Sequence, residues 1–424
     1  MFRASSNSRT DHFAGFAAWL VLLLAFAGWM PAARAGVANA PGANLQVSLI
    51  TYGPGETYWE RFGHDAIELR DVVGGEAVNF NYGVFDFDES GFLLNFARGR
   101  MHYLMDAAPS AQDEAYYVDA GRSVTRQVLR LTATQAAALR DFLLWNLRPE
   151  NTRYDYDYYV DNCTTRVRDA LDQALGGVLK TQLSARAGGL TYRQQTNRLM
   201  SAQPWLMLVL DLGLGPYADH PLSAWQESFL PAVLQRELGN AHVTDAQGMQ
   251  QPLVTAAQPV APNRLQSPPD SPPDLRIPLA LVGLSFAVAL LLTRRYAPTA
   301  MVALGALYLL LAALVGLVLL GLWTVTTHHS AWANANLLLF NPFALLLLPS
   351  LWRTRRQLLP SRLASGVMLL QLAAVLIAVL LHLLPGTVQQ NQPWLLFALP
   401  CWLALAWVVR HGLPAATTPA LARN

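Results

Sequence analysis

The fold is decided by residues 277–323, whose sequence is IPLALVGLSFAVALLLTRRYAPTAMVALGALYLLLAALVGLVLLGLW. Its two apolar segments, 277–293 and 299–323, are each close to the ~20 residues that an α-helix needs to cross a bilayer. We therefore expect an all-α bundle of about five transmembrane helices over residues 276–410. Asn341-Pro342 lies inside the third segment and predicts a kink or a delayed start there. The three further apolar segments are 337–352, 366–384 and 394–409.

In the connections between these segments, arginines lie at one end only. The loops at the other ends, 324–336 and 385–393, contain neither Lys nor Arg. Positive residues stay on the cytoplasmic side of a membrane. The pattern therefore places the start of the first segment outside and the tail 411–424 in the cytoplasm. The arginines that establish it are Arg294, Arg295, Arg353, Arg355, Arg356, Arg362 and Arg410.

The composition divides the chain into two parts. Charged residues make up 14% of the chain, against roughly 25% in an average soluble protein, and the deficit lies in the membrane segments. Residues 44–200 have an ordinary globular composition, and we expect a soluble domain over residues 44–240. Residues 241–275 are rich in Pro, Gln, Ala and Ser, which predicts a linker with little fixed structure. The net charge of +2 gives no indication of nucleic-acid binding.

The first 35 residues have the features of an export signal. Arg3 and Arg9 precede an apolar run at 13–30, and Ala33-Arg34-Ala35 is a small-x-small cleavage pattern. An uncleaved N-terminal anchor is the alternative. Either form sends the soluble domain across the membrane.

The soluble domain alternates between strand and helix patterns, which predicts an α+β fold. Residues 45–52, 64–70 and 77–87 are rich in β-branched, aromatic or alternating apolar residues and predict strands. Residues 132–147 and 162–175 have helical periodicity. Two segments are ambiguous: 205–214 is apolar but short for a span, and 225–238 fits an amphipathic helix at the membrane surface.

Cys163 is the leading candidate nucleophile. It is the only thiol of the soluble domain, because the second cysteine, Cys401, lies in an apolar segment. A helix start favours a thiolate and offers backbone donors to an oxyanion. The alternative is a small buried residue with no chemical role.

A cysteine nucleophile needs a base, and His64 is the best placed histidine. It begins a predicted strand directly after Gly63. Asn81 is the preferred residue to orient its ring, because it lies on the next strand. Asn79, Asp65 and Glu68 are the alternatives for that role, and the other histidines expected outside are His102, His220, His242, His328 and His329.

Four motifs resemble the periplasmic domain of the Lnb-type lipoprotein N-acyltransferase family: YGPG at 52–55, RFGHD at 61–65, NYGVFDF at 81–87 and YDYDYYVDNCTTRVRD at 154–169. The order of histidine, polar strand residue and cysteine at a helix start also resembles circularly permuted papain-like enzymes of the NlpC and lecithin:retinol acyltransferase (LRAT) type. The resemblance covers about residues 44–240, and the bundle resembles the family's C-terminal part.

The resemblance implies a thiol acyltransferase of the bacterial inner membrane, with its soluble domain in the periplasm. It would move an acyl chain from phospholipid through S-acyl Cys163 to the amino terminus of a lipoprotein, without a cofactor. Tyr52 and Asn162, which lie in these motifs, are candidate supporting residues.

The loop 327–336 (THHSAWANAN) also belongs to the resemblance. One interpretation is that Asn334 and Asn336 cap the helix that follows them and that Trp332 anchors the loop at the interface. The other is that His328 or His329 completes or covers the active site, or binds a lipid phosphate.

Two other classes of function fit the same residues. A thiol hydrolase (a phospholipase, thioesterase or peptidase) would use water where the transferase uses an amine. A non-enzymatic membrane scaffold would need no reactive thiol. The sequence contains no metal-binding motif, no Gly-rich nucleotide loop and no Gly-x-Ser-x-Gly elbow.

Overall fold

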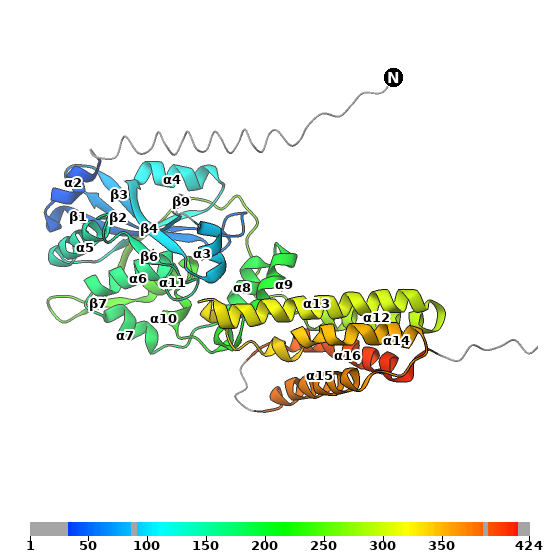
Figure 1. Ribbon diagram of the computed structural model, residues 1–424. Helices are drawn as coiled ribbons and strands as arrows, with labels where there is room; N and C mark the ends of the chain where they lie inside the picture. The colour runs from blue at the N-terminus through cyan, green and yellow to red at the C-terminus, as the bar shows by residue number, and fades with distance from the viewer. Residues whose placement is uncertain (1–32, 86–90, 385–388, 414–424) are drawn as a thin grey trace, which may run out of the picture. The chain divides into compact units, whose positions relative to one another are not determined.

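The structure, a computed structural model, describes residues 33–85, 91–384 and 389–413 (Figure 1). Its chain forms two compact units. The sheet unit contains the described residues up to 85 together with 101–188 and 223–267. The helical unit contains 91–100, 189–222 and the described residues from 268 onward. The apolar run of the predicted export signal, 13–30, lies outside the described residues.

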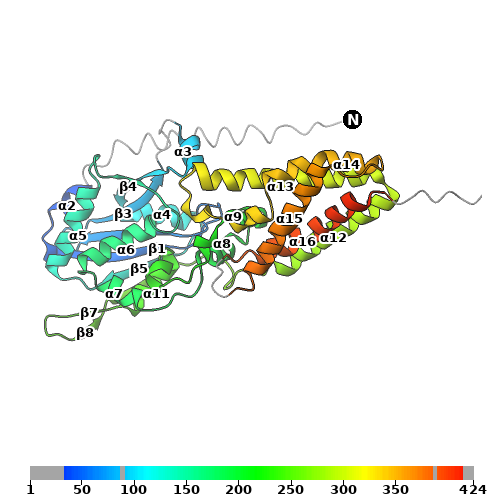
Figure 2. The same ribbon diagram turned by 60° about the horizontal axis from the view of Figure 1, so that its bottom comes forward.

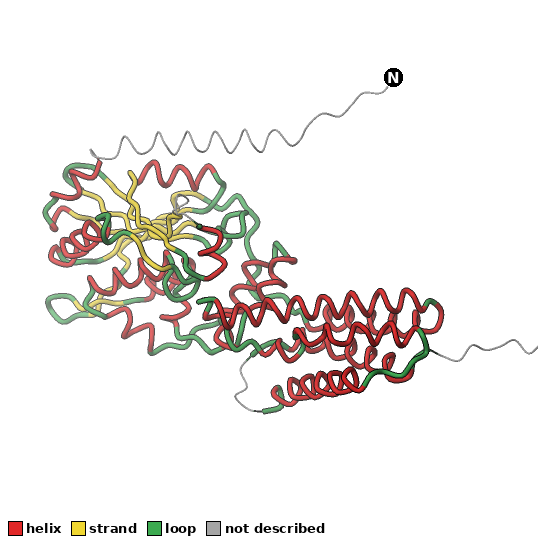
Figure 3. Tube along the Cα trace, in the orientation of Figure 1, coloured by secondary structure: helices red, strands yellow, loops and turns green. Residues whose placement is uncertain are grey.

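The sheet unit is built on a seven-stranded sheet in the order β6-β4-β3-β2-β1-β5-β9, in which every neighbouring pair is antiparallel. Figure 3 shows its strands in yellow. A two-stranded ribbon joins β7 to β8. The strands are β1 (Leu45–Tyr52), β2 (His64–Asp71), β3 (Ala77–Phe85), β4 (His102–Pro109), β5 (Val124–Leu129), β6 (Arg153–Asp155), β7 (His242–Thr244), β8 (Gln250–Pro252) and β9 (Val254–Ala261).

Both faces of the sheet are covered, because alternate side chains of its central strands enter two different apolar clusters. On β1, Val47 and Leu49 join the core formed with α5, α6 and α11. Ile50 and Tyr52 enter a smaller cluster with Tyr117 of α4. Figure 1 shows α4 and α6 on opposite sides of the strands. The helices of this unit are α2 (Ala33–Asn39), α4 (Ser110–Asp119), α5 (Ala133–Asn146), α6 (Cys163–Ala174), α7 (Val178–Ser184), α10 (Ala224–Glu227) and α11 (Pro231–Asn240), with the short turn η1 (Gly42–Asn44).

Capping residues fix the starts of the two helices that the sequence predicts. Thr132 accepts a hydrogen bond from the Gln135 amide, and Gln135 in turn bonds the Thr132 backbone. Asn162 and Thr165 form the same reciprocal box at the start of α6. Such a box satisfies two otherwise unpaired donors. The predicted α+β character is confirmed, and both helices begin where the caps place them.

Among the residues that the structure describes, the helical unit contains five segments that are long and apolar enough to cross a membrane, which confirms the expected bundle. They are α12 (Arg276–Tyr296), α13 (Pro298–Val325), the composite segment Ala335–Arg355, α15 (Arg362–Leu381) and α16 (Gln392–His411). The composite segment consists of the turns η4 (Ala335–Leu338) and η5 (Pro342–Leu347) and the helix α14 (Leu348–Arg355). It is interrupted at Asn341-Pro342, as the sequence predicts, because proline cannot donate to the preceding turn.

Shorter elements complete the helical unit. They are α3 (Phe92–Arg98), α8 (Tyr192–Met200), α9 (Pro204–Gly213) and the turns η2 (Pro216–Asp219) and η3 (His329–Ala331). Figure 2 shows α8 and α9 near one end of the long helices. Residues 189–222 therefore group with the spans, although the sequence places them in the soluble domain.

The structure differs from the sequence expectation in two further segments. Residues 242–261 of the expected linker form strands, and β9 pairs with β5 as an edge of the large sheet. The segment 225–238 is not one surface helix. Pro231 starts a second helix, α11, whose Leu234 and Leu238 are fully buried in the sheet core.

Candidate functional site

The candidate site begins with the side chains of His64 and Asn81. His64 is the first residue of β2, and Asn81 lies on the neighbouring strand β3, opposite Ala66. His64 Nε2 is 2.9 Å from Asn81 Oδ1. The structure therefore brings together the two residues that the sequence pairs, from two strands whose register is fixed by the buried face of the sheet.

Asp113 fixes the orientation of Asn81. Its Oδ2 atom accepts hydrogen bonds from Asn81 Nδ2 at 3.3 Å, Asn79 Nδ2 at 2.9 Å and the Tyr52 hydroxyl at 2.7 Å. A carboxylate only accepts, so it selects the amide nitrogen of Asn81 and turns the amide oxygen toward His64. His64 Nε2 must then donate, and Nδ1 carries the free lone pair of the neutral ring.

Two tyrosines hold the imidazole from the side. The Tyr117 and Tyr52 rings stack at 3.7 Å, and each ring centroid lies 5.9 Å from that of His64. Burial is the main cause that lowers the pKa of His64, although its bond to Asn81 opposes the shift. The ring is therefore neutral near pH 7 and has the protonation state of a base.

Cys163 is the first residue of α6 and lies close to both strands. A Cβ atom added to Gly83 of β3 would lie 3.2 Å from the Cys163 Cβ, and Gly83 has a φ of +90° that favours glycine. The backbone amide of Asp65, the residue after His64, is hydrogen-bonded to the thiol, as is that of Thr164. The thiol thus lies beside the strand end from which His64 projects.

The environment of the thiol keeps it protonated. Burial and then the nearby Asp65 carboxyl raise the pKa of Cys163 to about 11, against the effect of the hydrogen bonds from Thr164 and Asp65. Asp65 is itself fully buried, and its Oδ1 atom accepts a hydrogen bond of 2.7 Å from Thr51. Burial raises the pKa of Asp65 to about 7. A nearby base is needed before such a thiol can react near neutral pH.

Aromatic and apolar side chains lie on the segments that flank the thiol. Burial is the main cause that raises the pKa of Tyr103. The charges of Tyr158, Cys163 and Tyr58 raise it further, so these three side chains lie near Tyr103. Tyr103 stacks on Tyr156 at 4.1 Å. We call the exposed members of this surface the aromatic rim: Tyr58, Trp59, Val84, Tyr158 and Val160.

Asn162 holds the start of α6 in place. Its Oδ1 atom accepts from the Thr165 amide at 2.9 Å, and its Nδ2 atom donates to the carbonyls of Tyr158 and Phe229 at 3.0 Å each. This side chain is 6% exposed, so its contacts are all internal. Its role in the structure is to fix the position from which Cys163 projects.

The alternatives to Asn81 have other hydrogen-bond or ion-pair partners than His64. Asn79 bonds Tyr52, Ser110 and Asp113. Glu68 pairs with Arg70 and Arg126, and Asp65 points to the opposite face of β2 from His64, because neighbouring strand residues alternate.

The other histidines expected outside from the sequence make contacts of their own. His102 pairs with Asp155 at 3.2 Å, and Nδ1 of His220 and of His242 each contacts a backbone carbonyl. His328 Nε2 contacts the Phe96 carbonyl at 3.1 Å, and the His329 ring lies against Trp332.

Asn334 and Asn336 both have structural contacts in the helical unit. Asn334 caps η4 by accepting from the Asn336 amide at 2.9 Å, as expected of a capping residue. Both side chains also donate to backbone carbonyls at the end of α9. Asp113 and Tyr117 are the residues of the site that the sequence does not single out, since α4 reaches the site only through the fold.

Two family models match the chain. The model described as the Lnb N-terminal periplasmic domain matches residues 34–198, and the Lnb transmembrane domain matches residues 272–411. No curated protein and no solved structure matches it. The two models follow each other in the order of a sheet domain and five apolar helices. The chain is therefore an inner-membrane protein with a periplasmic domain, and it belongs to the Lnb family.

Proposed function

We propose that the protein is a thiol acyltransferase in which Cys163 is the nucleophile, His64 the base and Asn81 the residue that orients the ring. The observation that carries the proposal is the 2.9 Å contact between His64 Nε2 and Asn81 Oδ1, on the strand whose next residue, Asp65, has its backbone amide hydrogen-bonded to the Cys163 thiol. It leaves Nδ1 as the basic nitrogen. A neutral thiol and a neutral imidazole are the protonation states that general-base activation of a cysteine requires.

The first half-reaction acylates the enzyme. His64 Nδ1 removes the thiol proton as Cys163 Sγ attacks the carbonyl carbon of a phospholipid ester. The C–S bond forms, the ester C–O bond breaks, and His64 returns the proton to the departing lysophospholipid oxygen. The positive end of the α6 dipole, at Cys163, would stabilise the developing oxyanion.

The second half-reaction transfers the acyl chain to an amine. The amine attacks the thioester carbon, the C–N bond forms and the C–S bond breaks. His64 accepts the amine proton, and the thiol is restored. Family membership supports the amino terminus of a lipoprotein as the acceptor.

The aromatic rim supports a lipid donor. Tyr58, Trp59 and Val160 are about half exposed, with exposed fractions of 51%, 53% and 49%. Exposed apolar side chains on the segments that carry the nucleophile match a long acyl chain better than a polar substrate. The arginine pattern supports a periplasmic site and a cytoplasmic C-terminus.

The proposal is tested by complementation of a bacterial strain that lacks its own lipoprotein N-acyltransferase. Mass spectrometry of a lipoprotein's N-terminal peptide should detect one additional amide-linked acyl chain when the protein is expressed, and none with Cys163→Ala. An unchanged diacyl peptide despite normal expression overturns the transferase assignment. If free fatty acid is released instead, the protein is a hydrolase.

A further inference from the structure

The short helix α9 (Pro204–Gly213) has two apolar faces, and only one of them is covered by protein. Leu208 and Leu212 pack against the core of the transmembrane bundle, while Met207 and Asp211 are buried. Trp205 and Val209, four residues apart and therefore on one face, are 68% and 58% exposed. The only charged residue of α9, Asp211, is 2% exposed. The open face of α9 thus presents apolar groups and no charge.

Hydrogen bonds join the C-terminal end of α9 to the start of the third span. Asn334 Nδ2 donates to the carbonyls of Leu212 and Gly213 at 2.9 Å each, and Asn336 Nδ2 donates to Leu212 at 3.0 Å. Asn336 lies in the first turn of the span Ala335–Arg355. These bonds satisfy carbonyls that a helix end leaves unpaired.

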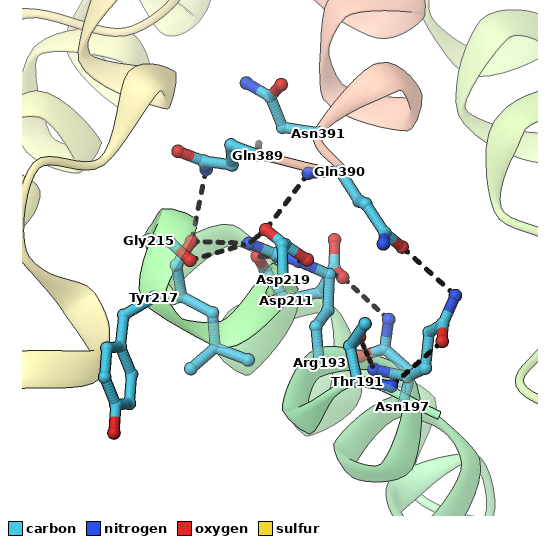
Figure 4. Close-up of polar contacts among 12 residues, drawn as sticks. Thr191, Arg193, Asn197, Asp211, Gly215, Tyr217, Asp219, Gln389, Gln390 and Asn391 are labelled. Carbon is cyan, nitrogen blue, oxygen red and sulfur yellow. Dashed lines mark hydrogen bonds and ion pairs between the residues drawn. The ribbon is translucent and has the colours of Figure 1, made fainter. Parts of the chain in front are cut away.

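A second contact fixes α9 to the start of the fifth span. Trp394, in the first turn of α16, donates from Nε1 to Asp211 Oδ2 at 2.7 Å. Arg193 of α8 pairs with Asp211 and with Asp219, whose Oδ1 atom lies 2.7 Å from Arg193 Nε (Figure 4). All three charged side chains are at least 96% buried. This buried cluster holds α9 rigidly at the end of the bundle.

We propose that the Trp205–Val209 face of α9 lies in the phospholipid leaflet in which the third and fifth spans begin. The lipid-exposed surface of the bundle continues onto this face, because α9 packs on the same core and is bonded to the first turns of two spans. Tryptophan prefers the boundary between headgroups and acyl chains, and an in-plane helix buries its apolar face at that boundary. The proposal does not depend on the acyl-transfer chemistry.

Site-directed spin labelling of the full chain in phospholipid nanodiscs tests this proposal. Labels are placed singly by Trp205→Cys and Val209→Cys in a Cys163→Ser, Cys401→Ala background. Leu310→Cys on the exposed side of α13 gives the lipid reference, and Asp141→Cys on α5 gives the water reference. The measured quantity is the ratio of collision rates with oxygen and with a water-soluble nickel complex.

Oxygen collisions should exceed nickel collisions at 205 and 209, as at 310. The reverse order, as at 141, would mean that the face is in water. Low collision rates with both reagents would mean a protein cover: a second copy if the spectra show dipolar broadening, and a different protein if they do not. Each of these outcomes overturns the proposal. All labelled positions are exposed, so the label itself should not disturb folding. Gel filtration of every variant identifies misfolded protein, so that misfolding is not mistaken for one of these outcomes.

Discussion

The carboxylate of Asp113 accepts a hydrogen bond from Asn81 Nδ2 at 3.3 Å, and this contact determines which ring nitrogen of His64 is basic. With the amide nitrogen turned to the carboxylate, the amide oxygen faces His64 Nε2 at 2.9 Å. The proton is therefore held on Nε2 and the lone pair on Nδ1. Three residues from three elements, Asp113 of α4, Asn81 of β3 and His64 of β2, thus act in one chain of contacts that ends at the base proposed for Cys163.

Replacing Asp113 should disturb this chain without touching the thiol. In Asp113→Ala, the donors of Asn79 and Tyr52 lose their acceptor, which costs about 1–3 kcal/mol of stability for a buried group left unpaired. Asn81 also becomes free to turn, so the acyl-transfer rate should fall by about tenfold or more, as for a misplaced base. Steady-state kinetics and thermal unfolding measure both effects. Asp119→Ala, at the exposed end of the same helix, should leave both unchanged.

Gly83 should tolerate no side chain, because it combines a positive φ with a close approach to Cys163. Gly75 is the matched control: it has a φ of +77° with nothing within 4 Å of an added Cβ. Alanine at either position bears a backbone cost of roughly 1–2 kcal/mol. Only Gly83→Ala should also reduce the acylation rate of Cys163, since its Cβ would lie 3.2 Å from that of the cysteine. Equal activity of the two variants would refute the close approach.

The acyl-transfer rate should fall at low pH because His64 becomes protonated. Burial lowers the pKa of His64 below its ordinary value of 6.5, so the base stays available below that pH and is lost only when the ring is protonated. The rate should therefore rise with pH to a plateau reached below neutrality. The same shift makes folding less favourable as pH falls below 6.5, because the unfolded chain binds the proton more readily. A kcat/KM profile with its acid inflection above pH 7 would contradict this environment.

Asp65 should hold the pKa of the thiol high. In Asp65→Asn the nearby charge is removed while an oxygen remains to accept from Thr51, so the thiol pKa should fall from about 11. The pH dependence of Cys163 alkylation by iodoacetamide measures it. The folded carboxyl, with a pKa of about 7 against 3.8, binds the proton more tightly than the unfolded chain. Wild-type stability should therefore decrease between pH 4 and 7 relative to the variant. An alkylation profile identical to wild type would exclude this role.

Local signals predicted much of this fold. Thr132 and Asn162 precede their helices with capping partners three residues later, so both starts could be predicted from the sequence. The uncharged loops and the five apolar segments predicted the bundle, and Pro342 predicted its broken member. His64 and Asn81 could be paired because strand periodicity places them near each other on adjacent strands.

The missed features depend on contacts between distant parts of the chain. Asp113 and Tyr117 reach His64 only after α4 folds onto the sheet, and nothing in their local sequence distinguishes them. The strand β9 has an exposed surface and contains Pro259, so it lacks an apolar pattern. An edge strand tolerates both, because one of its sides needs no partner. Asp211 sits in an apolar helix, and its Arg193 and Trp394 partners come from other elements.

The most direct test of the account is the mass of the enzyme after contact with its proposed donor. The full-length protein in nanodiscs of one defined phospholipid, without acceptor, should gain the mass of one fatty acid less one water at the Cys163 peptide. Neutral hydroxylamine should remove this adduct, and His64→Gln should form it far more slowly. An unmodified Cys163 in well-folded protein, or the same adduct in Cys163→Ala, would contradict the central claim.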